Sequence, residues 1–214
     1  PFRHLAEAIV SQQISGAAAR SILRRFVSAC GLDPLDDTMF PTPAVVLSLD
    51  APILRAAGLS AAKVIALQDL ARKTIDGIVP DTRTLLQLDD EAIVERLVTV
   101  RGIGRWTVQM MLMFQLGRPD VLPVDDYGVR NGFKLLFKKR ELPTPGELAR
   151  HGARWAPYRS AAAWYLWRAV DLAKTGELTS ALADVRAVRS PPPDARTPTR
   201  HRPRLRSRAP ASKR

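Results

Sequence analysis

The residues whose type best suits them to chemistry are two adjacent carboxylates, Asp125 and Asp126, in the segment P-V-D-D-Y-G-V-R. They precede a predicted helix, where an aspartate commonly caps the free N–H groups of the first turn. A carboxylate that faces a cationic groove has a second use, because it stabilises positive charge developing on a sugar and orients water. The two residues alone leave capping and catalysis open.

A glycine pair, Gly102 and Gly104, lies in V-T-V-R-G-I-G-R-W between two helical patterns. A dinucleotide site needs a preceding strand and a third glycine, but Thr107 stands at that position, and the Gly-Lys-Ser/Thr of a phosphate loop is absent. Two interpretations remain. One is an ordinary turn between helices. The other is a helix–hairpin–helix, in which the amides of residues 102–105 bind an anion such as a DNA phosphate.

The elements that must position these residues are helices, because the apolar residues recur with helical spacing almost everywhere and no convincing strand is found. We therefore expect an all-α protein with short connections. The predicted helices, besides one around Leu5–Gln12, cover about residues 17–30, 43–49, 51–57, 60–76, 89–98, 105–116, 126–137, 143–155 and 158–175.

The 214-residue chain carries a net charge of +12. Residues 190–214 are rich in arginine and proline and poor in large apolar residues, which predicts a disordered basic tail after a domain at residues 1–189. Such a tail attracts polyanions, although a solvated terminus without a role is equally consistent. The body remains basic without it, which favours a nucleic acid partner.

Cysteine and histidine content limits the cofactors. The single cysteine, Cys30, excludes an internal disulfide and a cysteine-ligated zinc or iron–sulfur site. The three histidines are far apart, so a histidine-based metal centre is not expected. The apolar stretches are too short to cross a bilayer and no signal peptide is visible, so we expect no membrane partner and a cytoplasmic setting, nucleoid-associated if bacterial.

Two longer motifs, R-G-I-G-R-W-T-x(17)-D-D-Y-G-V-R and W-A-P-Y-R-S-x(6)-W, carry a family resemblance. Together they resemble the helix–hairpin–helix (HhH-GPD) DNA glycosylases, and within them the 3-methyladenine glycosylase II (AlkA-like) branch. The resemblance covers about residues 2–175. It implies a two-lobed helical fold with the hairpin at about residues 98–106, an active site in the cleft between the lobes, and a monomer.

The resemblance also assigns the chemistry. It makes Asp126 the catalytic carboxylate, with Asp125 in a supporting or capping role. Bifunctional members carry a lysine where this chain has Trp106, so a monofunctional enzyme without lyase activity is implied. Trp106 and Trp167 would wall the pocket of the flipped base. Trp164 is the rival of Trp167, and Met110 is either a third pocket residue or an ordinary core residue.

The DNA contacts implied by the resemblance fall in two segments. The first is the hairpin, with Arg101, Gly102, Ile103, Gly104 and Arg105 against the backbone. The second, Gln12–Gln13–Ile14, enters the minor groove, with the wedge either Gln13 or Ile14; a polar turn is the alternative. The family's hairpin also holds a Na⁺ or K⁺ ion through main-chain carbonyls, which here would belong to Val98, Val100 and Ile103. No other cofactor is expected.

The expected function is excision of 3-methyladenine-type alkylated bases from duplex DNA in base excision repair, by base flipping and hydrolysis assisted by Asp126. Two alternatives stay open. A helix–hairpin–helix protein could bind DNA without catalysis, and a glycosylase could act on deaminated or oxidised bases, although that would call for more hydrogen-bonding groups in the pocket than tryptophan and methionine supply.

Overall fold

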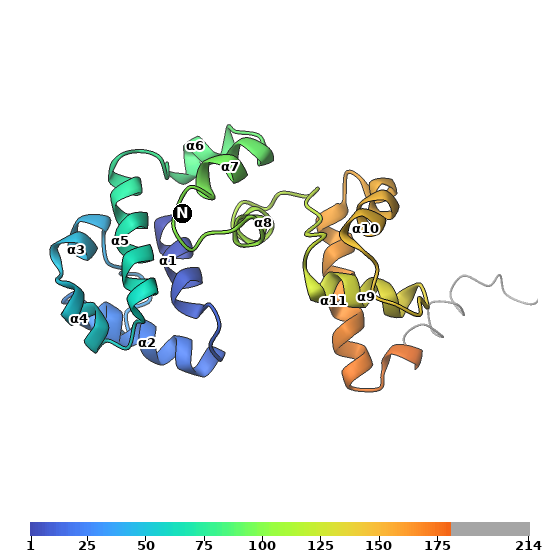
Figure 1. Cartoon of the computed structure of the whole chain (residues 1–214), viewed down its shortest axis with the longest axis horizontal. Helices are drawn as coiled ribbons and strands as arrows, with labels where there is room; N and C mark the ends of the chain where they lie inside the picture. Colours follow the sequence, from blue (N-terminus) through green and yellow to red (C-terminus); the bar gives the residue numbers. More distant parts are fainter. Residues whose placement is uncertain (181–214) are drawn as a thin grey trace, which may run out of the picture. The chain divides into compact units, whose positions relative to one another are not determined.

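A computed structural model describes residues 1–180, and the described chain is helical with no strand (Figure 1). The all-α prediction is therefore confirmed, and ten of its helices lie close to their predicted ranges. The helices are α1 (Phe2–Ser11), α2 (Gly16–Ala29), α3 (Pro43–Ser48), α4 (Ala51–Ala56), α5 (Ala61–Ile75), α6 (Thr82–Leu86), α7 (Asp90–Leu97), α8 (Arg105–Phe114), α9 (Tyr127–Leu136), α10 (Pro145–Gly152), the 3₁₀ turn η1 (Ala153–Trp155) and α11 (Arg159–Lys174).

Short polar side chains begin most of these helices. In seven of them the N-cap side chain accepts a hydrogen bond from a backbone N–H in the first turn, which satisfies one of the free donors there. Side-chain capping also accounts for the start of α6, a helix that the sequence analysis did not predict. Asp81 caps it, but its five residues are too few to show a helical repeat. The capping residues are Ser15, Thr42, Ser60, Asp81, Asp89, Asp126 and Thr144.

The first hydrophobic core unites α1 to α8. Helix α5 packs against both α1 and α3, and α7 packs against α8. Large apolar side chains from these helices are fully buried, including Phe26, Leu67 and Met111. Because α8 contributes Val108, Met111 and Leu112 to this core, the opposite edge of α8, with Trp106, stays exposed.

A second, smaller core joins α9, α10 and α11 around Val129, Phe133 and Leu166 (Figure 1). Glycine permits the contact between two of these helices. A Cβ atom on Gly132 would lie 2.0 Å from the main-chain oxygen of Leu166, so only glycine fits there. The close packing of α9 on α11 matters for the site, because α9 follows Asp126 and α11 carries Trp167.

The chain divides into two compact units, residues 1–172 and residues 173–214. Every predicted site residue belongs to the first unit. The predicted tail at residues 190–214 lies outside the described residues. Within the described part of the chain, no helix combines the length and the apolar character that a membrane span requires.

Candidate active site and DNA-binding hairpin

Asp126 sits at the N-terminus of α9 with its carboxylate held by three N–H donors. Its Oδ1 accepts hydrogen bonds from the Val129 amide at 2.7 Å and from Trp167 Nε1 at 2.8 Å. Its Oδ2 accepts from Trp106 Nε1 at 2.7 Å. The two tryptophans come from α8 and α11, so residues 20 and 41 positions away in the sequence converge on one carboxylate.

This arrangement stabilises a negative charge and fixes its direction. The N-terminus of a helix favours an anion, and each N–H donor adds to that preference. A carboxylate offers about four lone-pair positions, so three donors leave roughly one for a water molecule or a sugar. The Nε1–H of an indole lies in the ring plane. Trp106 can therefore bind Asp126 through its edge while a face of its ring remains available for stacking.

The neighbouring Asp125 is exposed, and Asp126 rather than Asp125 caps α9. The option that Asp125 caps the helix is therefore wrong. Asp126 is the cap because its Oδ1 accepts a hydrogen bond from the Val129 amide in the first turn of α9. The same oxygen accepts from Trp167, and the other oxygen accepts from Trp106. The hydrogen bonds by which Asp126 caps α9 therefore also orient its carboxylate.

Gly128 is a site residue that the sequence analysis missed. A Cβ atom there would lie 2.7 Å from Trp167 Cδ1 and 3.1 Å from Asp126 Oδ1. The absence of a side chain therefore lets the indole reach the carboxylate. Phe114 was also missed. It is 62% exposed and stacks on Trp167 with ring centroids 6.0 Å apart. Trp164, the rival of Trp167, is exposed and packs on Tyr165 instead.

The loop that leads to Asp126 is tied to the start of α11. Arg159 donates from Nε and Nη2 to the two carboxylate oxygens of Asp120 at 2.6 and 2.8 Å. Ser160 Oγ donates to the Arg118 carbonyl and accepts from the Val121 amide. These bonds fix the segment before Asp126 against the helix that carries Trp167.

The hairpin between α7 and α8 turns at its two glycines. Gly102 has φ +77°, a left-handed conformation that glycine adopts without strain. Gly104 is the N-cap of α8 and supplies no side chain to the first turn. The first amides of α8 therefore lack a side-chain cap, and no acidic residue occupies the first turn. This is the arrangement in which a helix N-terminus binds an anion.

Three side chains from other helices hold the hairpin main chain, and the sequence analysis named only the first of them. Gln12 Nε2 donates to the Gly102 carbonyl at 2.7 Å. Asp69 Oδ2 accepts from the Arg101 amide at 2.8 Å, and Lys73 donates to the Thr99 carbonyl. Burial alone raises the pKa of Asp69, but the bonds from the Arg101 amide and Lys73 outweigh it and lower that pKa below its usual value.

The two arginines of the hairpin differ in their surroundings. Arg101 is exposed, and only its amide is engaged in a hydrogen bond among the described residues. The Arg105 guanidinium is paired with both carboxylate oxygens of Glu91 on α7, and this pairing raises the pKa of Arg105. Arg101 is thus the freer of the two cations for a phosphate.

The turn between α1 and α2 presents the predicted minor-groove segment. Lys63 on α5 donates to the carbonyls of Val10 and Gln12 and so fixes the end of α1. Gln13 has φ +59°, a left-handed conformation that costs energy for a residue other than glycine. Ile14 is 36% exposed. With Gln12 bound to the hairpin, Gln13 and Ile14 are the residues that the turn projects.

A cavity of ≈ 440 Å³ opens between the end of α1 and the start of α8. The predicted pocket residues Trp106 and Met110 line it together, with Gln12 and Gln13 at one end, and it does not include Trp167. The complete lining is His4, Ala8, Ser11, Gln12, Gln13, Trp106, Thr107 and Met110.

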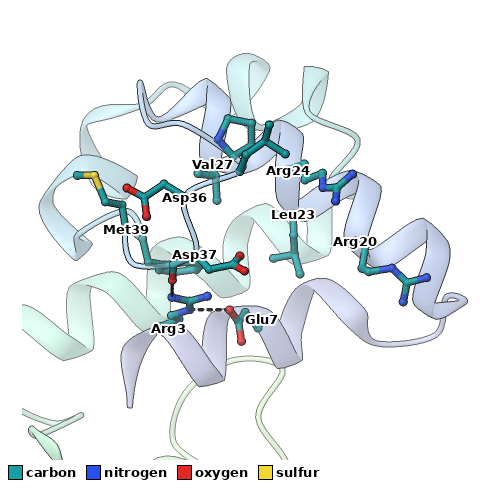
Figure 2. Close-up of a pocket in the computed structure, with 12 residues that line it drawn as sticks. Arg3, Glu7, Arg20, Leu23, Arg24, Val27, Asp36, Asp37 and Met39 are labelled. Carbon is teal, nitrogen blue, oxygen red and sulfur yellow. Dashed lines mark hydrogen bonds and ion pairs between the residues drawn. The ribbon is translucent and has the colours of Figure 1, made fainter.

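Figure 2 shows a different cavity, of ≈ 330 Å³, which other residues of α1, Arg3 and Glu7, line together with residues of α2 and the loop after it. Its charged groups are partly satisfied within the protein, because Arg3 binds Glu7 and the Asp37 carbonyl. None of the predicted site residues lines it. The cavity beside Trp106 is linked to the carboxylate through Trp106, which lines the cavity and donates to Asp126.

The carbonyl groups proposed for a cation are compatible with that use. Among the described residues, the oxygens of Val98 and Ile103 accept no hydrogen bond, while that of Val100 accepts one from the Ile103 amide. Oxygen atoms of this kind are the ligands that hard cations prefer. No group of three or more His, Cys, Asp or Glu side chains in the described part of the chain could hold a metal ion.

Comparison with known proteins adds the family. Residues 6–157 match the model of the HhH-GPD superfamily of base excision DNA repair proteins. The chain is 41% identical to DNA-3-methyladenine glycosylase 1 of Schizosaccharomyces pombe over 81% of this chain and 74% of that protein. It is 31% identical to DNA-3-methyladenine glycosylase 2 of Escherichia coli over 78% of this chain and 56% of that protein.

Solved structures agree. The 3-methyladenine DNA glycosylase of Schizosaccharomyces pombe, in complex with abasic DNA, superposes with a TM-score of 0.69 at 41% identity and covers 81% of this chain and 82% of its own. A DNA-3-methyladenine glycosidase from Bacillus halodurans superposes with a TM-score of 0.71 at 34% identity, over 79% and 75% of the two chains. By its sequence and its helical architecture, the chain belongs to the HhH-GPD superfamily of base excision DNA repair proteins.

Proposed function

We propose that this protein is a DNA glycosylase that releases alkylated purines, of the 3-methyladenine type, from duplex DNA during base excision repair. The observation that carries the proposal is the Asp126 carboxylate, held by the Val129 amide, Trp167 and Trp106, of which Trp106 also lines a cavity. The names of several relatives, all DNA-3-methyladenine glycosylases, support the choice of substrate.

The proposed reaction begins with extrusion of the damaged nucleotide from the duplex. Gln13 or Ile14 fills the vacated space, and the amides at the start of α8, with Arg101, bind the DNA backbone. The base then stacks on the free face of Trp106. A base that carries a positive charge gains a cation–π attraction of roughly 0.5–2 kcal/mol from the indole.

The chemical step is hydrolysis of the N-glycosidic bond. As the bond to the base breaks, the sugar acquires oxocarbenium character, and the fixed carboxylate of Asp126 lowers the energy of that charge. The lone pair of Asp126 that no N–H donor occupies can orient the attacking water. A cationic base leaves without prior protonation, so the reaction needs no strong general acid, and none of the three hydrogen-bond partners of Asp126 is one.

The proposal includes the absence of lyase activity. A lyase step needs an amine that attacks the sugar carbon. Trp106 stands where bifunctional members of the resembled family carry their lysine, and an indole nitrogen is not nucleophilic. We also propose that the enzyme acts as a monomer, and that a Na⁺ or K⁺ ion at the Val98, Val100 and Ile103 carbonyls would stiffen the hairpin.

The direct test is release of free bases from methylated duplex DNA by the purified protein. We expect 3-methyladenine and 7-methylguanine in the supernatant and an uncleaved DNA strand with abasic sites. Release of deaminated or oxidised bases alone would assign a different substrate class. DNA binding without release of any base would leave a non-catalytic helix–hairpin–helix protein.

A further inference from the structure

One polar side chain in the cavity beside Trp106 has no part in the reaction described above. His4 lies on α1, and the spacing of His4, Ala8 and Ser11 places all three on one face of that helix. This face lies opposite Trp106, Thr107 and Met110 of α8 across the cavity. The cavity thus combines apolar groups with the polar side chains of its glutamine end, Ser11, Thr107 and His4, and Ser11 Oγ already donates to the Glu7 carbonyl.

His4 and Gln13 lie toward opposite ends of this cavity. At about 1.5 Å of rise per residue, eight residues of α1 separate His4 from Gln12 by roughly 12 Å along the helix axis. Gln12 and Gln13 border the end beside the hairpin, where DNA is proposed to bind. For a base that enters past Gln13 and stacks on Trp106, His4 is a polar group at the far end of the cavity.

The His4 imidazole has an unused hydrogen-bonding capacity. It is half-buried, and its ring takes part in no hydrogen bond with any of residues 1–180. Its neighbours on α1, Arg3 and Glu7, are bonded to each other and line the cavity of Figure 2. A partly buried polar group without a partner loses free energy that a bound ligand can restore.

The surroundings of His4 favour the neutral form of its ring. Burial lowers the pKa of His4, while Glu7 offsets part of that shift. A neutral imidazole presents one N–H donor and one nitrogen acceptor. The acceptor nitrogen suits the amino group of an adenine-type base, and neutrality avoids repulsion of a cationic base.

We propose that His4 is a specificity-determining residue, which accepts a hydrogen bond from the 6-amino group of a flipped alkylated adenine and so favours it over alkylated guanine, which carries a carbonyl oxygen at that position. The inference rests on the proposed function, since it concerns the same cavity and the same reaction. The inference adds His4 to the candidate site, although His4 belongs neither to the hairpin motif nor to the motif around Asp126.

The test compares kcat/KM for 3-methyladenine and 7-methylguanine in wild type, His4→Ala and the control Arg20→Gln. A lost hydrogen bond to the base lowers the preference for 3-methyladenine by about tenfold in His4→Ala. Arg20→Gln, an exposed position on α2 that faces the cavity of Figure 2, keeps the wild-type ratio. If His4→Ala fails to fold, His4→Leu, which fills the space without hydrogen bonding, is measured in its place.

The outcomes separate the two levels of inference. No release of either base by wild type overturns the proposed function and with it the role of His4. Release by wild type with an unchanged ratio in a folded His4 variant overturns the role of His4 alone. An equal fall for both bases would also overturn it, because that pattern indicates a structural effect and not recognition of one base.

Discussion

In the hairpin between α7 and α8, side chains from distant helices bind main-chain atoms, whereas at the start of α9 a main-chain amide and two indoles bind a side chain. Gln12, Asp69 and Lys73 hold the hairpin backbone. Trp106 and Trp167 hold the Asp126 carboxylate. In the hairpin, these contacts fix the positions of the main-chain amides. At the start of α9, they fix the orientation of the Asp126 carboxylate.

The difference follows from what each region offers to DNA. Amides of the hairpin bind phosphate through backbone geometry, so any side chain that keeps the turn in place serves. The carboxylate acts through its own orientation, so its partners must be donors of defined direction. Substitutions should therefore affect base release most at the α9 turn, and DNA affinity or stability most at the hairpin.

The largest effect among the supporting residues is expected for Gly128→Ala. The added Cβ would lie 2.7 Å from Trp167 Cδ1, so the indole or the carboxylate must move. A misplacement of about 1 Å can cost roughly a hundredfold in rate, and we expect base release to fall by about ten- to a hundredfold. Single-turnover release measures this, with circular dichroism as a check of folding.

Gly146→Ala is the matched control. Gly146 also lies in the first turn of a helix, but a Cβ there would meet only Arg150 Nη1 at 3.6 Å, which is ordinary contact. We expect wild-type rates for this variant. A Gly128→Ala protein as fast as Gly146→Ala would show that the contact between Trp167 and Asp126 does not contribute to catalysis.

Asp69→Asn should act on the hairpin and not on the chemistry. The carboxylate is about one-fifth exposed and binds the Arg101 amide and Lys73, so its loss should cost about 1–2 kcal/mol of unfolding free energy at neutral pH. Because the pKa of Asp69 is lowered in the folded protein, its stabilisation is present above the unfolded value of 3.8 and is lost as the pH falls through the lowered pKa.

Urea unfolding of wild type and Asp69→Asn, at neutral pH and below pH 3.8, measures this difference. The gap between the two proteins should narrow in acid. Asp76→Asn, an exposed position at the end of the same helix, serves as the control. A gap that stays constant with pH would mean that the charge of Asp69 does not hold the hairpin.

The smallest effect is expected for Arg101→Ala. Loss of one phosphate contact should reduce the slope of log Kobs against log salt concentration by about 0.9, with base release from bound DNA unchanged. Arg105→Ala should change the slope less, because Glu91 already pairs with that guanidinium. Fluorescence anisotropy with duplex DNA over a salt series distinguishes the two, and a larger change for Arg105 would contradict this assignment.

The sequence predicted the helices well because their apolar spacing and their caps are local signals. It predicted the turn at Gly102 for the same reason, since a glycine pair between helices has few explanations. Helix α6 escaped because five residues are too few to show a period. The clamps at Asp69 and Lys73 escaped because nothing in a helical stretch of the sequence indicates which exposed polar residue meets a distant carbonyl or amide.

The candidate site shows the same division. Asp126, Trp106 and Trp167 are recognisable by type and motif, and the structure brings all three together. Their hydrogen bonds are not readable from the sequence, since they depend on α8, α9 and α11 meeting at one point. Gly128 carries no chemistry of its own, and only the packed structure reveals that a side chain there would collide with Trp167.

The central claim is that the Asp126 carboxylate, oriented by the two indoles, performs the chemistry. The most direct measurement is single-turnover release of 3-methyladenine by wild type, Asp126→Asn and Asp125→Asn, alongside their affinity for duplex DNA that carries an abasic site. In Asp126→Asn the charge is lost, and the new side-chain amide must direct its own N–H groups toward one of the N–H donors that now bind the carboxylate. We predict at least about a hundredfold loss for Asp126→Asn, a near-wild-type rate for Asp125→Asn, and unchanged affinity in both. Wild-type release by Asp126→Asn, or the loss falling on Asp125→Asn, would contradict the account.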